Sequence, residues 1–153
     1  MIRLIEINEE NWLRAAALEV TEEQKKYLDS PVGIIARGYA YRAARARVIG
    51  IEGDGELIGL ALVKDLDEEP ACYDLQQFFI DRRYQGRGYG TKALRAILAR
   101  LSAERKYDRV DLCVNKNDAA AIRVYKKVGF RDTGYVDEDA PDCMNLTYRF
   151  EDE

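Results

Sequence analysis

The chain has 153 residues, of which 47% are hydrophobic and 34% charged, and 24 basic against 28 acidic side chains give a formal net charge of −4. This length fits one domain, and the acidic balance argues against a general attraction to nucleic acid or anionic lipid. Histidine is absent, which excludes Ser-His-Asp and Cys-His triads and zinc sites that need imidazole. Any chemistry must therefore use carboxylates, tyrosine, cysteine, lysine, backbone amides or water.

The three cysteines, Cys72, Cys113 and Cys143, are far apart and have no paired spacing. We therefore expect neither a disulfide framework nor a set of zinc ligands. Cys72 and Cys113 lie in apolar stretches, which predicts that both are buried. No segment approaches the roughly 20 apolar residues of a membrane span, and the N-terminus lacks a long apolar signal region. These features predict a cytoplasmic protein with no metal site and no membrane partner.

The chain begins with a predicted strand that is followed by two helices. Apolar and polar residues alternate over 2–7, which is typical of a short strand, and Asn8 can cap the helix that follows. Thr21 and Gln24 form a Thr-x-x-Gln capping box. This box predicts a second helix over 22–28.

A third helix is predicted after the Ser30-Pro31 pair, because a residue before proline avoids helical geometry and breaks the chain there. The segment 33–47 is rich in alanine and arginine. Basic and aromatic side chains recur along it, namely Arg37, Tyr39, Tyr41, Arg42, Arg45 and Arg47. They are the one feature that favours a nucleic-acid binder, but the net charge opposes it. We expect them to form a solvated helix face or part of a binding-site wall.

Two β-rich runs, over 48–51 and 57–63, are joined around Asp54-Gly55, which is a strong signal for a two-residue hairpin. The acidic stretch 65–69 precedes Pro70 and is expected to be a solvated loop. The next strand is predicted over 73–80.

The second half of the chain alternates helices and strands. A glycine-rich segment, 85–90, leads into a helix over 91–104, and Gly129 is the expected left-handed cap of a later helix. The remaining elements are a strand over 110–114, a helix over 118–128 and strands over 130–136 and 144–150. This order predicts a single domain over 1–153 of the α/β (α+β) class, with three layers around a mixed sheet of about seven strands and helices on both faces.

The segment 78–92 places a glycine-rich turn between the end of a strand and the start of a helix. A helix N-terminus offers unpaired N–H groups and the positive end of the helix dipole, and both favour phosphate. Cationic side chains accompany it, namely Arg82, Arg83, Arg87 and Lys92. The segment therefore predicts a phosphate site in preference to a plain turn with a solvated basic face.

Two common nucleotide motifs do not fit this segment. A P-loop ends in Gly-Lys-Ser/Thr, whereas Gly90-Thr91-Lys92 has the last two residues in the other order. A dinucleotide fold needs Gly-x-Gly-x-x-Gly, and the glycines here are Gly86, Gly88 and Gly90. Both nucleotide interpretations are therefore weak.

Residues 85–90, Gln-Gly-Arg-Gly-Tyr-Gly, resemble the Gln/Arg-x-x-Gly-x-Gly/Ala acetyl-CoA signature of the GNAT superfamily of N-acetyltransferases. Residues 121–130 are similar to its second signature, Ala-Ile-x-x-Tyr-x-x-x-Gly-Phe. The expected order of elements also resembles that superfamily over nearly the whole chain. The resemblance implies an acetyl-CoA-dependent N-acetyltransferase, and direct attack by a primary amine fits because neither signature contains a cysteine.

The resemblance also implies roles for particular residues. The amides of the glycine segment would hold the pyrophosphate of CoA, and the end of the preceding strand would pair with the pantetheine arm. The implied cofactor-binding residues are Phe79, Ile80, Gln85, Gly86, Arg87, Gly88, Tyr89, Gly90, Thr91 and Asn117. Tyr125 would be the general acid, because a phenol with a pKa of about 10 can protonate a thiolate whose thiol has a pKa of about 8.5.

One position departs from the family pattern. Members often carry asparagine three residues before the Ala-Ile pair, where this chain has Asp118. Asp118 remains a good helix cap, but its charge would repel a phosphate of CoA. Either Asn117 takes over the pantetheine contact or the loop is shifted.

The amine must lose a proton before it attacks, and without histidine the base is a carboxylate or water. Asp74 lies where some histone-type members carry a catalytic carboxylate, and Gln76 on the same strand face can help to order a water. A plain solvated role for Asp74 is the alternative.

The N-terminal half and the glycine segment resemble the bacterial spermine/spermidine subset, which favours a polyamine-like acceptor. The alternatives are protein or peptide amines as acceptors, and a non-catalytic acyl-CoA-binding or regulatory module on the same fold. A homodimer is possible.

Overall fold

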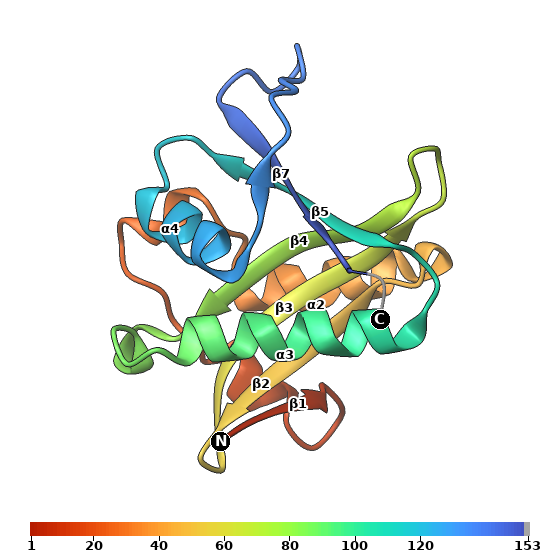
Figure 1. Ribbon diagram of the computed structural model, residues 1–153. Helices are drawn as coiled ribbons and strands as arrows, with labels where there is room; N and C mark the ends of the chain where they lie inside the picture. Colours follow the sequence, from red (N-terminus) through yellow and green to blue (C-terminus); the bar gives the residue numbers. More distant parts are fainter. Residues whose placement is uncertain (152–153) are drawn as a thin grey trace.

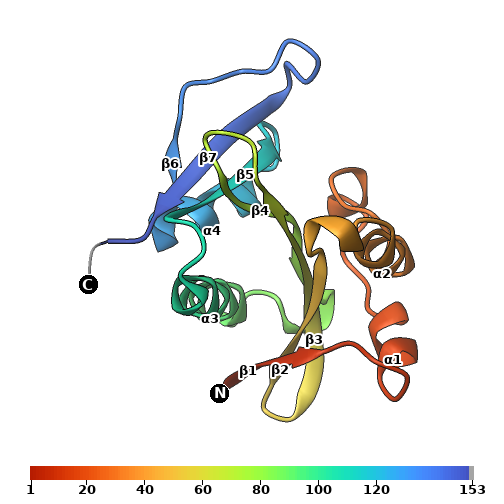
Figure 2. The ribbon, with the colours of Figure 1, turned by 90° about the vertical axis from the view of Figure 1, so that its right-hand side faces the viewer.

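The computed structural model describes residues 1–151, which form one sheet with helices on both faces (Figures 1 and 2). The sheet has seven strands in the order β1-β2-β3-β4-β5-β7-β6, and only β4 and β5 pair in parallel. The strands are β1 (Ile2–Glu6), β2 (Arg47–Gly53), β3 (Glu56–Leu66), β4 (Cys72–Ile80), β5 (Arg109–Asn115), β6 (Arg131–Asp132) and β7 (Cys143–Arg149). The predicted three-layer fold with a mixed seven-stranded sheet is therefore confirmed.

The helices separate into two layers, with α1 and α2 on one face of the sheet and α3 and α4 on the other (Figure 2). The α-helices are α1 (Trp12–Ala16), α2 (Pro31–Ala40), α3 (Tyr89–Glu104) and α4 (Ala119–Val128), and the short 3₁₀ helices are η1 (Gln24–Lys26), η2 (Arg42–Ala44) and η3 (Arg82–Tyr84). Each layer buries its own apolar cluster against the sheet. Within residues 1–151, no helix has the length and apolar character needed to cross a membrane.

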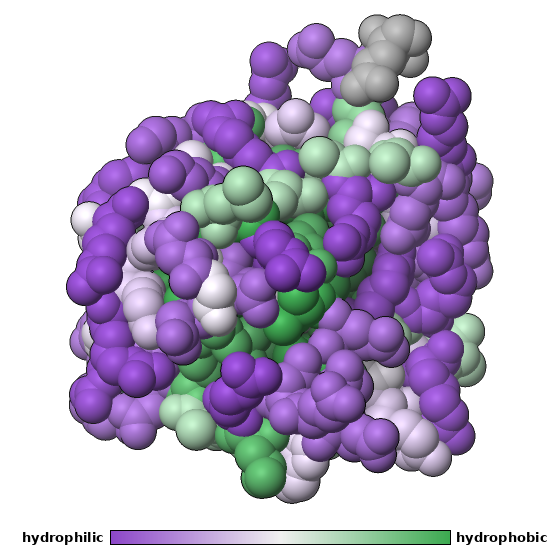
Figure 3. Space-filling model, turned by 90° about the horizontal axis from the view of Figure 1, so that it is seen from below, coloured by the Kyte–Doolittle hydropathy of each residue, from purple (hydrophilic) through white to green (hydrophobic). Residues whose placement is uncertain are grey.

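The edge strand β1 contributes apolar side chains to both clusters, because its side chains alternate between the two faces of the sheet. Ile2 and Leu4 pack on the α3 side, whereas Ile5 and Ile7 pack on the α1 side. Figure 3 shows an apolar band that crosses this lower end of the molecule between polar side chains.

The strands β4 and β5 pair only where they begin. Their register contains Tyr73 with Val110 and Asp74 with Asp111, and no further pair. Beyond these residues the two strands separate. The backbone groups on their facing edges therefore have no strand to pair with, although β4 still pairs with β3 and β5 with β7. A bulge in β4, opposite Leu62 and Val63, adds an irregularity at the same level of the sheet. The opening between β4 and β5 is the feature that positions the site.

The local signals for turns and caps are mostly confirmed. Asp54 and Gly55 both have positive φ angles, of 50° and 86°, as a two-residue hairpin turn of type I′ requires. The helix predicted from residue 91 begins at Tyr89, and Gly129 caps α4. The cap of α1 differs from the prediction, because Asn11 and not Asn8 occupies the N-cap position.

Two predicted helices are shorter than expected. The capping box forms, since the amides of Thr21 and Gln24 each donate to the other residue's side chain at 3.1 and 3.3 Å. Only η1 follows it, because so short a segment gains too few hydrogen bonds to offset the cost of helix nucleation. The helix predicted over 33–47 starts at Pro31, with Ser30 as its cap, and ends at Ala40. A proline is compatible with the first position of a helix, so Ser30-Pro31 starts this helix.

The acidic stretch 65–69 is not entirely a solvated loop, as was expected. Asp65 lies in β3 and is only 5% exposed. Its carboxylate accepts hydrogen bonds from Arg45, Arg47 and Lys106 at 2.8–3.3 Å. These partners explain why Arg45 and Arg47 leave the predicted helix, and they hold the pKa of Asp65 below its ordinary value in spite of burial.

We expect Asp65→Asn to lower the free energy of unfolding at pH 7 by about 1–3 kcal/mol, because three partly exposed cations lose their buried partner. The folded-state pKa of Asp65 is lowered. The stabilisation is therefore present above the unfolded pKa and disappears as the pH falls through the folded one. Urea titrations from pH 7 to pH 3 should show the two proteins converging. Glu68→Gln, in the exposed part of the same stretch, is the control, and a constant difference across pH would contradict the assignment.

The burial prediction is right for Cys72 and wrong for Cys113, which is exposed. Val110, Leu112 and Val114 of β5 pack in the cluster under α3 and α4, so the alternating Cys113 points to the other face of the sheet, where α1 and α2 pack mainly on β2 and β3. The strand predicted over 130–136 is also shorter and comprises only β6. Residues 152–153 of the predicted domain lie outside the described part.

Candidate active site

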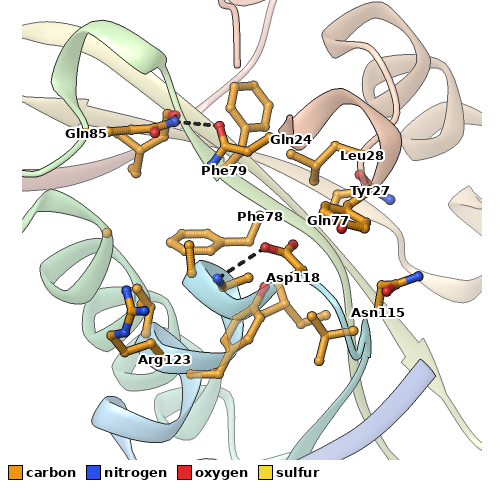
Figure 4. Close-up of a pocket in the computed structure, with 18 of the residues that line it drawn as sticks. Gln24, Tyr27, Leu28, Gln77, Phe78, Phe79, Gln85, Asn115, Asp118 and Arg123 are labelled. Atoms are coloured by element: carbon orange, nitrogen blue, oxygen red, sulfur yellow. Dashed lines mark hydrogen bonds between the residues drawn. The ribbon is translucent and has the colours of Figure 1, made fainter. Parts of the chain in front are cut away.

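A cavity of about 400 Å³ lies where β4 and β5 separate. Its wall combines the end of β4, the glycine segment before α3, the first turns of α4 and the segment around η1. Figure 4 shows Gln85 and Arg123 toward one end of the cavity and Tyr27, Leu28 and Gln77 toward the other. Elements that are far apart in the sequence therefore surround one cavity. One end lies beside the glycine segment and α4, and the other lies beside η1 and the middle of β4.

The end of β4 offers unpaired backbone groups to this cavity. Asp81 donates its N–H to Ile58 in β3 at 2.7 Å. The preceding residue, Ile80, faces the opposite way, and its carbonyl accepts a hydrogen bond of 2.7 Å from the side chain of Gln85. Since successive residues of a strand point their N–H and C=O groups to opposite edges, Phe78 and Ile80 present theirs to the opening. The backbone of Phe79 faces β3, although Phe79 also lines the cavity.

The glycine segment forms a cradle at the N-terminus of α3. Gly86 and Gly88 line the cavity with φ angles of 78° and 83°, and a Cβ atom on either would meet no protein atom within 4 Å. The first amides of α3, from Tyr89 to Thr91, have no helical acceptors. Free N–H groups beside open space fit a phosphate group.

The side chains of Arg87 and Tyr89 point away from this cradle. The Arg87 guanidinium lies over the ring of Tyr84 at 5.8 Å, and the Tyr89 hydroxyl donates to Asp54 at 2.8 Å. Neither residue lines the cavity, whereas Arg123 of α4 does. No sequence motif singled out Arg123, but its place directly after Ala121-Ile122 on the second signature could have marked it.

Tyr125 lies in the cavity wall between α4 and β4. It is 8% exposed, and its ring packs against Phe130 and Phe78 at centroid distances of 5.6 and 6.3 Å. Burial, and secondarily the charge of Asp118, raise the pKa of Tyr125 above its ordinary value. The phenol is therefore protonated at neutral pH and can act as a proton donor.

The loop between β5 and α4 brings a different asparagine to the cavity from the one predicted. Asn115, at the end of β5, lines the cavity together with Asp118, whereas Asn117 is exposed and does not line it. The amide of Asn117 donates to the Asn115 side chain at 2.9 Å. Asp118 caps α4 by accepting from Ala121, and burial raises the pKa of its carboxyl. The position of Asn115 as the last residue of a strand was the available signal.

The other end of the cavity is built by the segment after η1 and by the bulge in β4. Gln76 and Gln77 both face α2, because the bulge interrupts the alternation of side chains. Gln77 accepts a hydrogen bond of 3.1 Å from the amide of Asp29, which holds the segment carrying Tyr27 and Leu28 against the strand. This end is lined by amide, phenol and apolar groups.

Asp74 lies behind Gln76 and does not line the cavity itself. The side-chain amide of Gln76 donates to its carboxylate at 3.1 Å. Burial, and then the charge of Asp111, raise the pKa of Asp74, while Gln76, Lys64 and Arg37 oppose that rise. A carboxylate with a raised pKa, linked to the cavity wall through Gln76, is a candidate general base.

Known proteins resemble this chain in sequence and in fold. A model of the acetyltransferase (GNAT) family matches residues 5–130. The spermine/spermidine N(1)-acetyltransferase of Bacillus subtilis is 30% identical over 148 residues, which cover 94% of this chain and 96% of that protein. The crystal structure of spermidine N-acetyltransferase from Vibrio cholerae, in complex with CoA and spermine, shares the fold with a TM-score of 0.76 and 16% identity, over 97% of this chain and 95% of that one. The crystal structure of an aminoglycoside acetyltransferase in complex with coenzyme A shares the fold with a TM-score of 0.79 and 17% identity, over 97% of this chain and 95% of that one.

Proposed function

The chain belongs to the acetyltransferase (GNAT) family and is an N-acetyltransferase, and from this premise we propose that it moves an acetyl group from acetyl-CoA to a primary amine of a small, polyamine-like molecule. One observation carries the proposal. The cradle at the start of α3, the open edge of β4 and the buried hydroxyl-bearing ring of Tyr125 surround the same cavity. This arrangement can bind a phosphate-containing chain at one end and an amine at the other.

The cradle and the open strand edge support the placement of the cofactor. The amides of residues 86–91 would bind the pyrophosphate, and Arg123 would add a positive charge. The backbone groups of Phe78 and the N–H of Ile80 would pair with the amides of the pantetheine arm, while the Ile80 carbonyl is held by Gln85. Asn115 is better placed than Asn117 for a contact with that arm. The thioester would then lie beside Tyr125.

The chemistry follows from the groups around the thioester. An ammonium group loses a proton to Asp74 through water ordered by Gln76, and the neutral amine attacks the thioester carbonyl. The new C–N bond forms, the C–S bond breaks, and the departing thiolate takes the proton of the Tyr125 hydroxyl. The attacking nitrogen then gives up its second proton, which restores the Tyr125 hydroxyl, and Asp74 releases the first proton to solvent. The products are an acetamide and free CoA. No covalent acyl-enzyme is required.

The proposal of a polyamine-like acceptor rests on two features. Spermine and spermidine appear in the names of relatives that the chain matches over nearly its whole length. Carboxylates lie at or behind the cavity wall, namely Asp118 and Asp74, and attract a cation. The cytoplasm is the compartment in which such a substrate and acetyl-CoA meet.

Acetylation of an amine panel by the full chain tests the proposed function. With acetyl-CoA fixed, CoA thiol release and product mass should be measured for spermine, spermidine, free amino acids, a lysine peptide and an aminoglycoside. We expect spermine or spermidine to give the highest kcat/KM. Transfer only to the peptide would replace the polyamine by a protein acceptor, and CoA binding without thiol release for any amine would favour the non-catalytic alternative.

We expect Gly88→Val to weaken CoA binding by about 10-fold or more, because a side chain there occupies the space where the phosphate contacts the amides. Gly55→Val is a matched control, since Gly55 also has a positive φ, of 86°, with open space around its Cβ position, but lies in the hairpin turn. Both variants bear similar backbone strain. Calorimetric titration with CoA should separate them, and equal losses would contradict the cradle.

A further inference from the structure

Arg37 of α2 links the acceptor end of the cavity to the proposed base. Its guanidinium donates to the carboxylate of Asp29 at 2.6 Å and to the side-chain oxygen of Gln76 at 2.9 Å. Arg37 does not line the cavity, so it acts only through the residues that it holds. One contact leads to the segment carrying Tyr27 and Leu28, and the other leads into β4.

The contact with Gln76 determines which way its amide points. A guanidinium has only donors, so the group that faces Arg37 must be the Gln76 oxygen. The amide nitrogen is therefore turned the other way, and it donates to Asp74 at 3.1 Å. Without Arg37, the Gln76 oxygen loses its donor, and the amide is held at one end only, by its bond to Asp74.

The contact with Asp29 holds the acceptor wall. The backbone N–H of Asp29 donates to Gln77 at 3.1 Å, while its side chain pairs with Arg37. The segment carrying Tyr27 and Leu28 is thus fastened to β4 and to α2 by adjacent bonds. A loss of either bond would loosen the end of the cavity where the amine is expected.

We propose that Arg37 is a positioning residue for acetyl transfer, which orients Gln76 toward Asp74 and, through Asp29, holds the acceptor wall in place. The inference rests on the proposed function, because it concerns the base and the amine site of that reaction. It gives a specific role in the reaction to Arg37, for which the sequence left open a solvated helix face or part of a binding-site wall.

Several charged or titratable groups face Asp74 besides Arg37. They are Lys64 from β3, Asp111 and Cys113 from β5, and Cys72 from the same strand. Of these, Lys64 favours the ionised carboxylate, as Arg37 and Gln76 do, whereas Asp111 disfavours it. Removal of Arg37 takes away a positive charge and an ordered hydrogen bond. The pKa of Asp74 should therefore rise, and the acidic limb of the pH profile should move to higher pH.

The test compares Arg37→Met with Arg42→Met, a nearby arginine whose guanidinium lies over Tyr39 at 4.0 Å and touches no residue of the site. We expect Arg37→Met to raise the amine KM and to lower kcat/KM for the amine about 10-fold. The acidic limb of the pH profile should move to higher pH, and the KM for acetyl-CoA should stay unchanged. Arg42→Met should match the wild type. Arg37→Lys should recover little, because a single ammonium does not reproduce the two-pronged contact.

Gln76→Met provides a second variant with a similar side-chain volume, which keeps the test valid if Arg37→Met does not fold. The double variant should lose about as much activity as the more impaired single one, because both act through one chain of contacts. Wild-type protein that acetylates no amine would refute the proposed function. Active wild type together with an unchanged amine KM and pH profile in Arg37→Met, or fully additive losses, would overturn the role of Arg37 alone.

Discussion

Tyr125→Phe is expected to lower kcat by about 10²–10⁴-fold, which is the usual contribution of a positioned general acid. The ring is buried against Phe78 and Phe130, so the variant keeps the packing and loses only the hydroxyl. The affinity for CoA should stay nearly the same, because the cradle at the start of α3 is untouched. Thiol release under saturating substrate, together with calorimetric CoA titration, measures both quantities.

Tyr148→Phe is the control for this prediction, because Tyr148 belongs to the same aromatic cluster, next to Phe130, but does not line the cavity. It should leave turnover unchanged. The raised pKa of Tyr125 adds a second expectation. The acid stays protonated through the neutral and mildly alkaline range, so wild-type activity should not fall there. Undiminished turnover of Tyr125→Phe at every pH would refute the acid role.

Asp74→Asn is expected to lower kcat/KM for the amine by about 100-fold near neutral pH, because the substrate then loses its proton only to solvent. The deficit should shrink as the pH rises, since more of the amine is neutral before it binds. In the wild type, burial raises the pKa of Asp74. The base is active above that pKa, so the acidic limb of the profile should lie at higher pH than an ordinary aspartate would give. A pH profile of kcat/KM for both proteins measures this.

Asp111→Asn is the matched carboxylate control, one strand away and paired in register with Asp74. The charge of Asp111 raises the pKa of Asp74, so its removal should move the acidic limb to lower pH with little loss of maximal activity. If Asp74→Asn behaved like the wild type across the pH range, a solvated role would apply to Asp74, and the amine would lose its proton to water.

Most features that depend on a few neighbouring residues were correctly predicted, although the cap at Asn8 was not. The hairpin turn at Asp54-Gly55 and the cap at Gly129 depend on local backbone geometry, which the residue types determine. The glycine segment before α3 combines a strand end and a helix start, and the cavity forms beside it. The two family signatures are also short local patterns. The residues that they contain, among them Tyr125 and the glycines of 85–90, line the same cavity.

The surroundings of charged and polar side chains could not be predicted in this way. Asp65 can be buried because three cations converge on it, from the residue after η2, from β2 and from the loop after α3. Cys113 is exposed because α3 and α4 cover only the other face of β5, which carries Leu112 and Val114. Asn115 lines the cavity in place of Asn117 because β4 and β5 separate after their first residues.

By itself, the sequence determined the family, the class of fold and the exclusion of imidazole chemistry. Composition and short motifs express these properties directly. Only the tertiary structure decided how Arg37, Gln76 and Asp74 are connected, since α2 and β4 are about forty residues apart in the sequence and meet through packing on β3. The pKa of Asp74 is raised because the carboxyl is buried, and burial is a property of the assembled sheet.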